Sequence, residues 1–181
     1  MHLHSNLQAV VEHLIAQVDA DRLRRNLFHL SSHPLPFRKL NYIRQGGPQN
    51  TLYEADDFIS QQLEQSGYAV EKEAVTVRPF GCDTTKPKAH QYAAPVENAP
   101  EFTAYNLYAK KRGLTYPEEI ILFLSHKDSQ SWVDSPGAYD NGAGTIATME
   151  IARLVADYDC HRSIWFLFCN EEHTPWTSVT A

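Results

Sequence analysis

Five residues in the second half of the chain have side chains suited to metal binding and proton transfer. They are one histidine and four carboxylates: His126, Asp128, Asp140, Glu171 and Glu172. Imidazole nitrogen and carboxylate oxygen are both ligands of zinc in proteins. Several carboxylates around one histidine indicate two metal ions that share a carboxylate, because the acidic groups would otherwise repel one another. Such ions polarise a carbonyl and generate hydroxide near neutral pH, and one of the adjacent glutamates can then move the proton.

Each group alone also has an ordinary structural explanation. A His-x-Asp sequence or a pair of glutamates often does no more than end a strand with solvated polar side chains. Asp140 or Asn141 could be the N-cap of the helix that follows. The groups together are harder to explain in this way, because all of them border a single strand–helix–strand unit.

Two apolar runs and the helix between them position these groups. The runs at 120–124 and 164–168 predict strands that are buried on both faces. Residues 142–157 have the apolar spacing of a helix, with Glu150 and Arg153 on its opposite stripe. This βαβ unit predicts an α/β fold with a mostly parallel or mixed sheet and helices on both faces. The polar groups would then meet at the carboxyl ends of the strands.

The rest of the chain supports one domain over residues 1–181, with a helical lead-in at 1–50 and an α/β core at 51–181. Apolar spacing predicts helices at 7–18, from about 19 to 30, and from 51 to 66. The last of these helices begins with a capping box formed by Thr51 and Glu54. Further strands are expected at 68–77 and 102–109, with a long loop between them.

Composition argues against several functional classes. A formal charge of -6 without a cluster of Lys and Arg disfavours nucleic acid as a partner. No apolar stretch reaches the roughly 18 residues of a membrane span, and the first residues lack the pattern of a signal peptide. We therefore expect no membrane partner and a cytoplasmic location. Three irregularly spaced cysteines predict no disulfide framework.

The order of the motifs resembles peptidase family M28, which comprises zinc aminopeptidases and related metallopeptidases. The resemblance is carried by HKD after the first strand, GAYDNGAG before the helix and NEE after the second strand. Upstream, DRLRRNLFHLSSHPLPFR and TLYEADDFISQQLEQSGYAV also look like the N-terminal portion of the family. The resemblance covers the chain roughly from Asp21 onward and implies the three-layer αβα fold of zinc exopeptidases.

The resemblance implies a role for each of the five residues. His126 matches the first zinc ligand, Asp140 the aspartate that bridges two zinc ions, and Glu172 a ligand of the second ion. Asp128 matches the carboxylate that orients the histidine, and Glu171 matches the general base. The family also has a cis peptide bond directly after the bridging aspartate.

Two features depart from the family pattern. A glycine-rich segment usually follows the glutamate pair, whereas this chain has His173 and Pro175. We interpret His173 as a capping or surface residue, with an extra polar group at the site as the alternative. The family also supplies one more carboxylate ligand and one more histidine ligand downstream, and no other histidine of this sequence matches them. We therefore expect an incomplete N-terminal portion of the family domain.

The function implied by the resemblance is hydrolysis of peptide bonds, as an aminopeptidase acting through a metal-bound hydroxide with Glu171 as base. Zinc is the implied cofactor, with two ions in a complete site, and a peptide is the implied substrate. Two alternatives remain open. One is a non-catalytic binding module of the same fold, and the other is an acyltransferase similar to glutaminyl cyclase.

Overall fold

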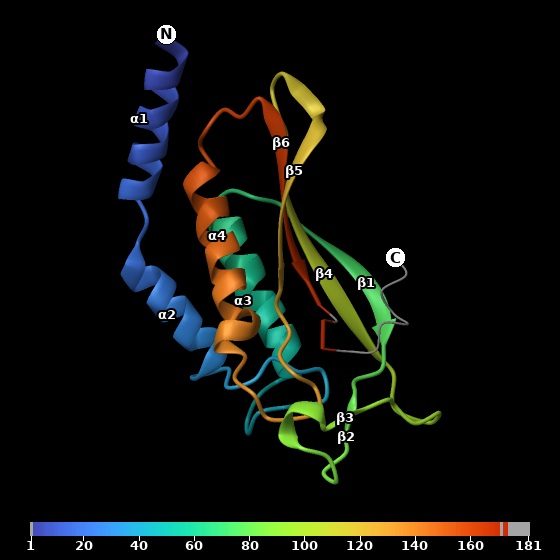
Figure 1. The fold of residues 1–181 in the computed structure, drawn as a ribbon. Coiled ribbons are helices and arrows are strands. Elements are labelled where there is room, and N and C mark those ends of the chain that lie inside the picture. Colours follow the sequence, from blue (N-terminus) through green and yellow to red (C-terminus); the bar gives the residue numbers. More distant parts are fainter. Residues whose placement is uncertain (1, 171, 174–181) are drawn as a thin grey trace.

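The computed structural model describes residues 2–170, 172 and 173. They form a four-stranded sheet, a layer of helices and a small two-stranded hairpin (Figure 1). The elements, in chain order, are α1 His2–Ala16, α2 Ala20–Ser31, α3 Thr51–Gln65, β1 Val70–Val77, β2 Gly81–Cys82, η1 Lys88–His90, β3 Tyr92–Ala93, β4 Phe102–Lys111, β5 Tyr116–His126, η2 Ala138–Gly142, α4 Ala143–Val155 and β6 Arg162–Cys169.

The main sheet is mixed, with the strand order β1–β4–β6–β5. β5 and β6 run parallel and are joined through α4, whereas the β1–β4 and β4–β6 pairs are antiparallel. The predicted βαβ unit and the mixed α/β fold are therefore confirmed. The parallel register places His126 opposite Cys169, so the carboxyl ends of β5 and β6 reach the same edge of the sheet.

The hydrophobic core lies between the sheet and the helices. Ile59 of α3, Met149 of α4 and Phe166 of β6 belong to one buried cluster, and Phe166 is fully inaccessible to solvent. Burial of a side chain of this size contributes about 1.5–3 kcal/mol. The βαβ unit that carries the polar motifs is therefore attached to the rest of the fold by its apolar side.

The helices of the described residues cover one face of the sheet (Figure 1). On β5, Ile120, Leu122 and Leu124 are 48%, 50% and 59% exposed. The predicted burial of this run on both faces is therefore wrong within residues 2–170, 172 and 173, and the second helical layer of the prediction has no counterpart there. The reason is that β5 is an edge strand of the described sheet. Ile121, which points to the other face, is also 46% exposed, so the helix layer covers this strand only in part.

The N-cap of α3 is Asn50, one residue before the predicted cap. Its side chain accepts a hydrogen bond of 2.9 Å from the Tyr53 backbone N–H. Thr51 instead accepts a hydrogen bond from the Lys39 backbone N–H at 3.1 Å, and Glu54 forms an ion pair with an arginine of the preceding loop. The predicted capping box is wrong because both of its side chains take part in tertiary contacts.

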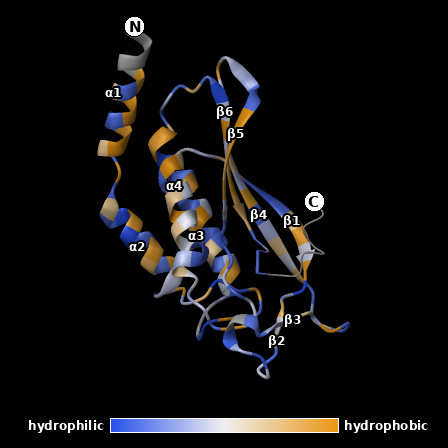
Figure 2. Ribbon diagram, viewed as in Figure 1, coloured by the Kyte–Doolittle hydropathy of each residue, from blue (hydrophilic) through white to orange (hydrophobic). Residues whose placement is uncertain are grey.

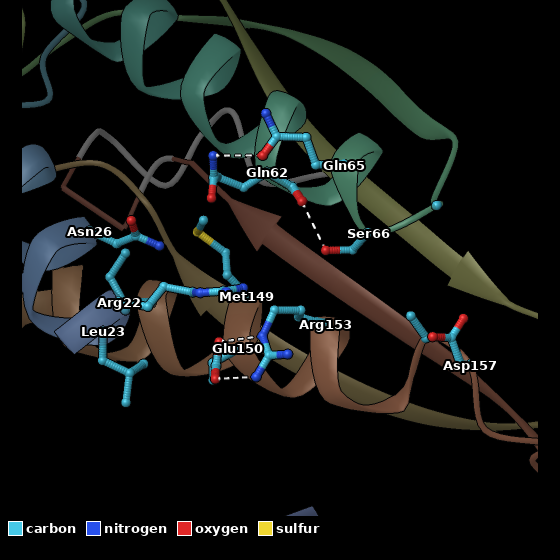
Figure 3. A pocket seen from close by; sticks show the side chains of 13 residues that line it. Arg22, Leu23, Asn26, Gln62, Gln65, Ser66, Met149, Glu150, Arg153 and Asp157 are labelled. Carbon is cyan, nitrogen blue, oxygen red and sulfur yellow. Dashed lines mark hydrogen bonds and ion pairs between the residues drawn. The ribbon is translucent and has the colours of Figure 1, made fainter. Parts of the chain in front are cut away.

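α1 extends away from the helix layer and carries hydrophobic residues along its length (Figures 1 and 2). Its junction with α2 is attached to α4 through Glu150, which accepts hydrogen bonds from Asp19 N at 3.1 Å and from Arg153 Nη2 at 2.7 Å. Glu150 and Arg153 line a groove of about 540 Å³ between α2, α3 and α4 (Figure 3). Glu150 is only 5% exposed, so its predicted place on the outer stripe of α4 is wrong.

Among the described residues, no helix combines the length and the apolar character needed to cross a bilayer. The organisation of residues 1–181 as one domain, with a lead-in at 1–50 and a core at 51–181, stays a prediction.

Candidate metal centre

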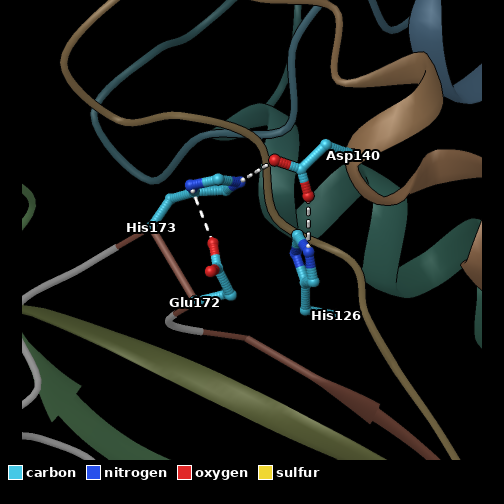
Figure 4. Close-up of side chains that lie close together, drawn as sticks. All are labelled: His126, Asp140, Glu172 and His173. Atoms are coloured by element: carbon cyan, nitrogen blue, oxygen red, sulfur yellow. Dashed lines mark hydrogen bonds and ion pairs between the residues drawn. The ribbon is translucent and has the colours of Figure 1, made fainter. Parts of the chain in front are cut away.

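Four side chains meet beyond the ends of β5 and β6: His126, Asp140, Glu172 and His173 (Figure 4). One potential ligand atom of each lies within 4.8 Å of those of the others. They come from the end of β5, from the turn before α4 and from the segment after β6. The structure thus brings the three predicted ligands together and adds His173, while the predicted base Glu171 lies outside the described residues.

His126 lies between two carboxylates. Its Nδ1 is 3.2 Å from Oδ1 of Asp128, and its Nε2 is 2.9 Å from Oδ1 of Asp140. Asp128 is 3% exposed, and its Oδ2 accepts a hydrogen bond of 3.0 Å from the His173 backbone N–H. Asp128 therefore contacts the ring nitrogen of His126 that faces away from Asp140.

The charges of the site shift the pKa values of both members of this pair. Burial acts to lower the pKa of His126, but hydrogen bonding to Asp128 and the charges of Asp128, Glu172 and Asp140 outweigh it and raise the pKa. Burial acts to raise the pKa of Asp128, but its hydrogen bond and charge interaction with His126 outweigh it and lower the pKa. Asp128 is therefore an ionised acceptor for Nδ1–H. A divalent cation next to Nε2 would take the place of a proton between His126 and Asp140.

His173 is buried, with 6% of its surface exposed, so its interpretation as a surface residue is wrong. Its carbonyl oxygen accepts a hydrogen bond of 2.9 Å from Ser131 Oγ. Its Nδ1 is 2.9 Å from Oε2 of Glu172, and its Nε2 is 3.6 Å from Oδ2 of Asp140. The rings of His126 and Trp132 lie edge-on to it, with centroids 5.1 and 5.6 Å away.

Asp140 lies in the π-helical turn η2, where it and Asn141 have non-helical backbone angles and are joined by a cis peptide bond. The cis bond implied by the family resemblance is thus present. Gly137 opens the turn with φ +57°, and a Cβ there would lie 2.8 Å from Asp140 O. A Cβ on Gly144 would come within 2.1 Å of Asn141 Oδ1, which accepts a hydrogen bond from Gly144 N at 3.0 Å. Glycine is therefore required on both sides of Asp140.

Arg38 connects the segments that carry the site. Its guanidinium is fully buried and donates to the carbonyl oxygens of Lys127 at 2.6 Å, Pro136 at 2.8 Å and Gly137 at 2.9 Å. A further hydrogen bond goes to Leu30 O at the end of α2. One side chain thus holds the residue after His126 and the turn that carries Asp140 at a fixed separation.

Arg38 was not identified from the sequence as a site residue. It lies in a loop without periodicity, and its partners are 89 and more residues away along the chain, apart from Leu30. Burial lowers the pKa of Arg38 to about 10, with the charges of Asp128 and Asp140 acting against the shift. The guanidinium therefore remains charged at neutral pH, where it interacts with the negative charges of Asp128 and Asp140.

The composition of the cluster suits a transition-metal ion. It offers two imidazole nitrogens and two carboxylates, which is the mixture of donors that zinc and similar ions accept. Within residues 2–170, 172 and 173, the buried Nε2 of His173 has no hydrogen-bond partner, and such an atom is expected to have one in a folded protein. The residues therefore fit a bound divalent cation.

Comparison with known proteins gives a family match in this region. Residues 106–176 match the model of peptidase family M28. A probable aminopeptidase of Saccharomyces cerevisiae is 40% identical over 62 residues, which are 32% of this chain and 17% of that protein. Carboxypeptidase Q of Mus musculus is 38% identical over 58 residues, which are 32% of this chain and 12% of that protein.

Similar solved structures share the fold over most of the chain. Glutaminyl cyclase of Macrostomum lignano has a TM-score of 0.63 at 12% identity, covering 87% of this chain and 40% of that one. A leucine aminopeptidase precursor of Bacteroides thetaiotaomicron has a TM-score of 0.60 at 19% identity, covering 86% and 48%. The matched part is thus less than half the length of each relative. Residues 106–176 are thus similar in sequence to peptidase family M28, and the chain shares its fold with solved structures such as the leucine aminopeptidase precursor.

Proposed function

We propose that the chain carries the metal site of a zinc-dependent peptidase, with His126, Asp140 and Glu172 as ligands. The observation that carries the proposal is the convergence of these side chains, from three separate segments, within 4.8 Å at the carboxyl end of a parallel strand pair. The match of residues 106–176 to peptidase family M28 supports peptide hydrolysis as the reaction. The similarity of the fold to a Zn-dependent exopeptidase from Parabacteroides distasonis, with a TM-score of 0.60, supports the proposal.

The metal and the residues that would bind it have different proposed roles. Zinc bound here would polarise the scissile carbonyl and lower the pKa of a bound water to near neutral. His126 would bind through Nε2, because Asp128 holds its Nδ1. Asp140 directs Oδ1 to His126 and Oδ2 toward His173, so either of its oxygens could bind the metal.

Glu171 is assigned as the general base, from its place in the motif beside Glu172. It would take a proton from the attacking water and pass it to the leaving amine. The proposed substrate is a peptide with a free N-terminus, as in the probable aminopeptidase of Saccharomyces cerevisiae. Because the chain is also similar to carboxypeptidase Q, the test must exclude cleavage at the C-terminal end of the peptide.

The direct test is to load the full chain with zinc and assay unblocked peptides, N-acetylated peptides and peptides with N-terminal glutamine. Release of the first residue from unblocked peptides alone supports the proposal. Release of the last residue would replace aminopeptidase with carboxypeptidase. Ammonia release from the glutamine peptide would favour the cyclase alternative. Stoichiometric zinc without any turnover would favour the non-catalytic module.

Substitution of the proposed base separates chemistry from metal binding. In Glu171→Gln we expect kcat to fall by about 10²–10⁴-fold, because an amide cannot accept the proton, while the zinc content stays unchanged. Steady-state kinetics and metal analysis of the same preparation measure the two quantities. Glu97→Gln, which changes an exposed glutamate far along the chain from the motifs, is the matched control. Full activity in Glu171→Gln would contradict the assignment of Glu171 as the general base.

A further inference from the structure

The structure assigns a second histidine to the metal centre. We propose that Nε2 of His173 binds the same ion as His126 and Asp140, and this inference rests on the proposed metal site. The family pattern has small residues at this position, so the resemblance does not supply the assignment. It follows from four observations on the burial, the tautomer, the backbone contacts and the neighbours of His173.

The first observation is a buried nitrogen without a partner. His173 is 6% exposed, and its Nε2 makes no hydrogen bond within the described part of the chain. Its separation of 3.6 Å from Oδ2 of Asp140 is too long for a hydrogen bond. Leaving such a buried atom without a partner destabilises the folded protein. A metal ion next to Nε2 would remove this destabilisation.

The second observation is the tautomer. Oε2 of Glu172 lies 2.9 Å from Nδ1 of His173, and a carboxylate there accepts the Nδ1 proton. Nε2 then carries a lone pair that points toward Asp140 (Figure 4). A carboxylate that fixes the ring of a metal-binding histidine in this way is a recurrent feature of zinc sites.

The same arrangement occurs at His126. Asp128 contacts its Nδ1, and its Nε2 faces Asp140. The two imidazoles therefore present equivalent nitrogens to the two oxygens of one carboxylate, at 2.9 and 3.6 Å. The pair is not a chance approach of one flexible side chain, because both rings are oriented by their own acidic partner.

The third and fourth observations concern the position of the ring. Oδ2 of Asp128 accepts the His173 backbone N–H, and Ser131 donates to its carbonyl oxygen. Asp128 thus orients His126 through one oxygen and holds the backbone of His173 through the other. The Trp132 ring lies edge-on to His173 and limits its movement.

Two histidines and one carboxylate make a set that is known in catalytic zinc sites, where three protein ligands leave a position for water. Here the set is His126, Asp140 and His173, which come from the end of β5, the turn before α4 and the segment after β6. One oxygen of Glu172 orients His173, and its other oxygen would be the one that binds the ion in the proposed site. These side chains would together bind one divalent ion.

Cobalt provides a readout that does not depend on activity. The metal-free full chain is titrated with Co²⁺, followed by competition with Zn²⁺. We expect one tightly bound Co²⁺ with the visible absorption of a nitrogen- and oxygen-ligated ion. His173→Ala should weaken binding at least about tenfold and change the spectrum. His126→Ala should weaken it as much or more, and His90→Ala, an exposed histidine of η1, should match the wild type.

The outcomes separate this inference from the proposed function. Wild-type affinity and spectrum in His173→Ala, together with lost binding in His126→Ala, would overturn the role of His173 and leave the peptidase proposal intact. Failure of the wild type to bind Co²⁺ or Zn²⁺ would overturn both. His173→Gln is the second variant if the alanine variant does not fold. In that case, zinc should raise the unfolding midpoint of the wild type by more than that of His173→Gln, and an equal rise would contradict the inference.

Discussion

Lys127 lies between two site residues in the sequence but points away from the site. Its Nζ is 2.6 Å from Oδ1 of Asp56 on α3, and their side chains are 0% and 2% exposed. Burial raises the pKa of Asp56, and the positive charge of Lys127 opposes the shift. The backbone carbonyl of Lys127 also accepts from Arg38. The residue therefore fixes the end of β5 to the helix layer while His126 and Asp128 face the metal centre.

Breaking this buried ion pair is expected to be costly. Lys127→Met leaves an unpaired carboxylate in the interior, so we expect the free energy of unfolding to fall by about 3–5 kcal/mol. The double variant Asp56→Leu/Lys127→Met removes both charges and should recover most of that loss. Urea unfolding of the metal-free wild type, Lys127→Met, Asp56→Leu and the double variant measures the cycle, and a double variant that loses the sum of both single losses would contradict the account.

The exposed pair of Lys72 and Asp57 is the control for this cycle. Their charged atoms are 3.7 Å apart, and their side chains are 41% and 65% exposed. Loss of a solvated pair of this kind costs about 0–1 kcal/mol. Lys72→Met should therefore change the unfolding free energy much less than Lys127→Met does.

At the level of elements, Glu150 joins α4 to the junction of α1 and α2. Burial acts to raise the pKa of Glu150, but hydrogen bonds from Arg153 and from Asp19 N, together with the charge of Arg153, outweigh it and lower the pKa below its ordinary value of 4.5. A lowered pKa in the folded state means that the ionised carboxylate stabilises the fold above that value. This contribution is lost as the pH falls through the folded-state pKa.

Glu150→Gln should therefore destabilise the protein in a pH-dependent manner. We expect a loss of about 1–3 kcal/mol near neutral pH, because the hydrogen bonds lose their charged acceptor. The difference from the wild type should shrink as the pH falls below the ordinary glutamate pKa. Denaturant unfolding across this range measures it, and Glu118→Gln, at an exposed position, is the control. A difference that stays constant down to low pH would contradict the linkage.

For the molecule as a whole, the open face of the described sheet carries several exposed apolar side chains. Ile120, Leu122 and Leu124 lie on β5, which is also an edge strand with one unpaired side. An edge of this kind is a template for pairing with another chain, and an adjoining apolar stripe strengthens the contact. The isolated chain is therefore expected to self-associate as its concentration rises.

Lysines on this face should weaken that association. In Leu122→Lys/Leu124→Lys we expect a larger monomer fraction at a given concentration, because the charges repel and the apolar area shrinks. Sedimentation velocity over a concentration series measures the fraction. Leu114→Lys, at a residue that is 70% exposed between β4 and β5, is the control and should leave association unchanged. Identical behaviour of the double variant and the wild type would exclude this face.

The local pattern of residues in the sequence was sufficient to predict the central strand–helix–strand unit of the fold. The strands at β5 and β6, the helix α4 and the positions of His126, Asp140 and Glu172 follow from apolar periodicity and from residue type after a strand end. These signals are local, because each depends on neighbours within one or two turns or along one strand. The structure brings His126, Asp140 and Glu172 together, but their roles as ligands and the roles of Asp128 and Glu171 stay predictions.

Long-range packing accounts for the rest. The burial of Arg38 and Glu150 and the place of His173 inside the site depend on contacts across 42 to 131 residues of sequence. The exposure of one face of the sheet likewise depends on which elements lie beside β5. The sequence pattern of an apolar run is the same whether one or both faces of the strand are covered. Residue type and spacing thus indicate which groups can do chemistry, whereas the tertiary contacts set the distances between them and the charge each one carries.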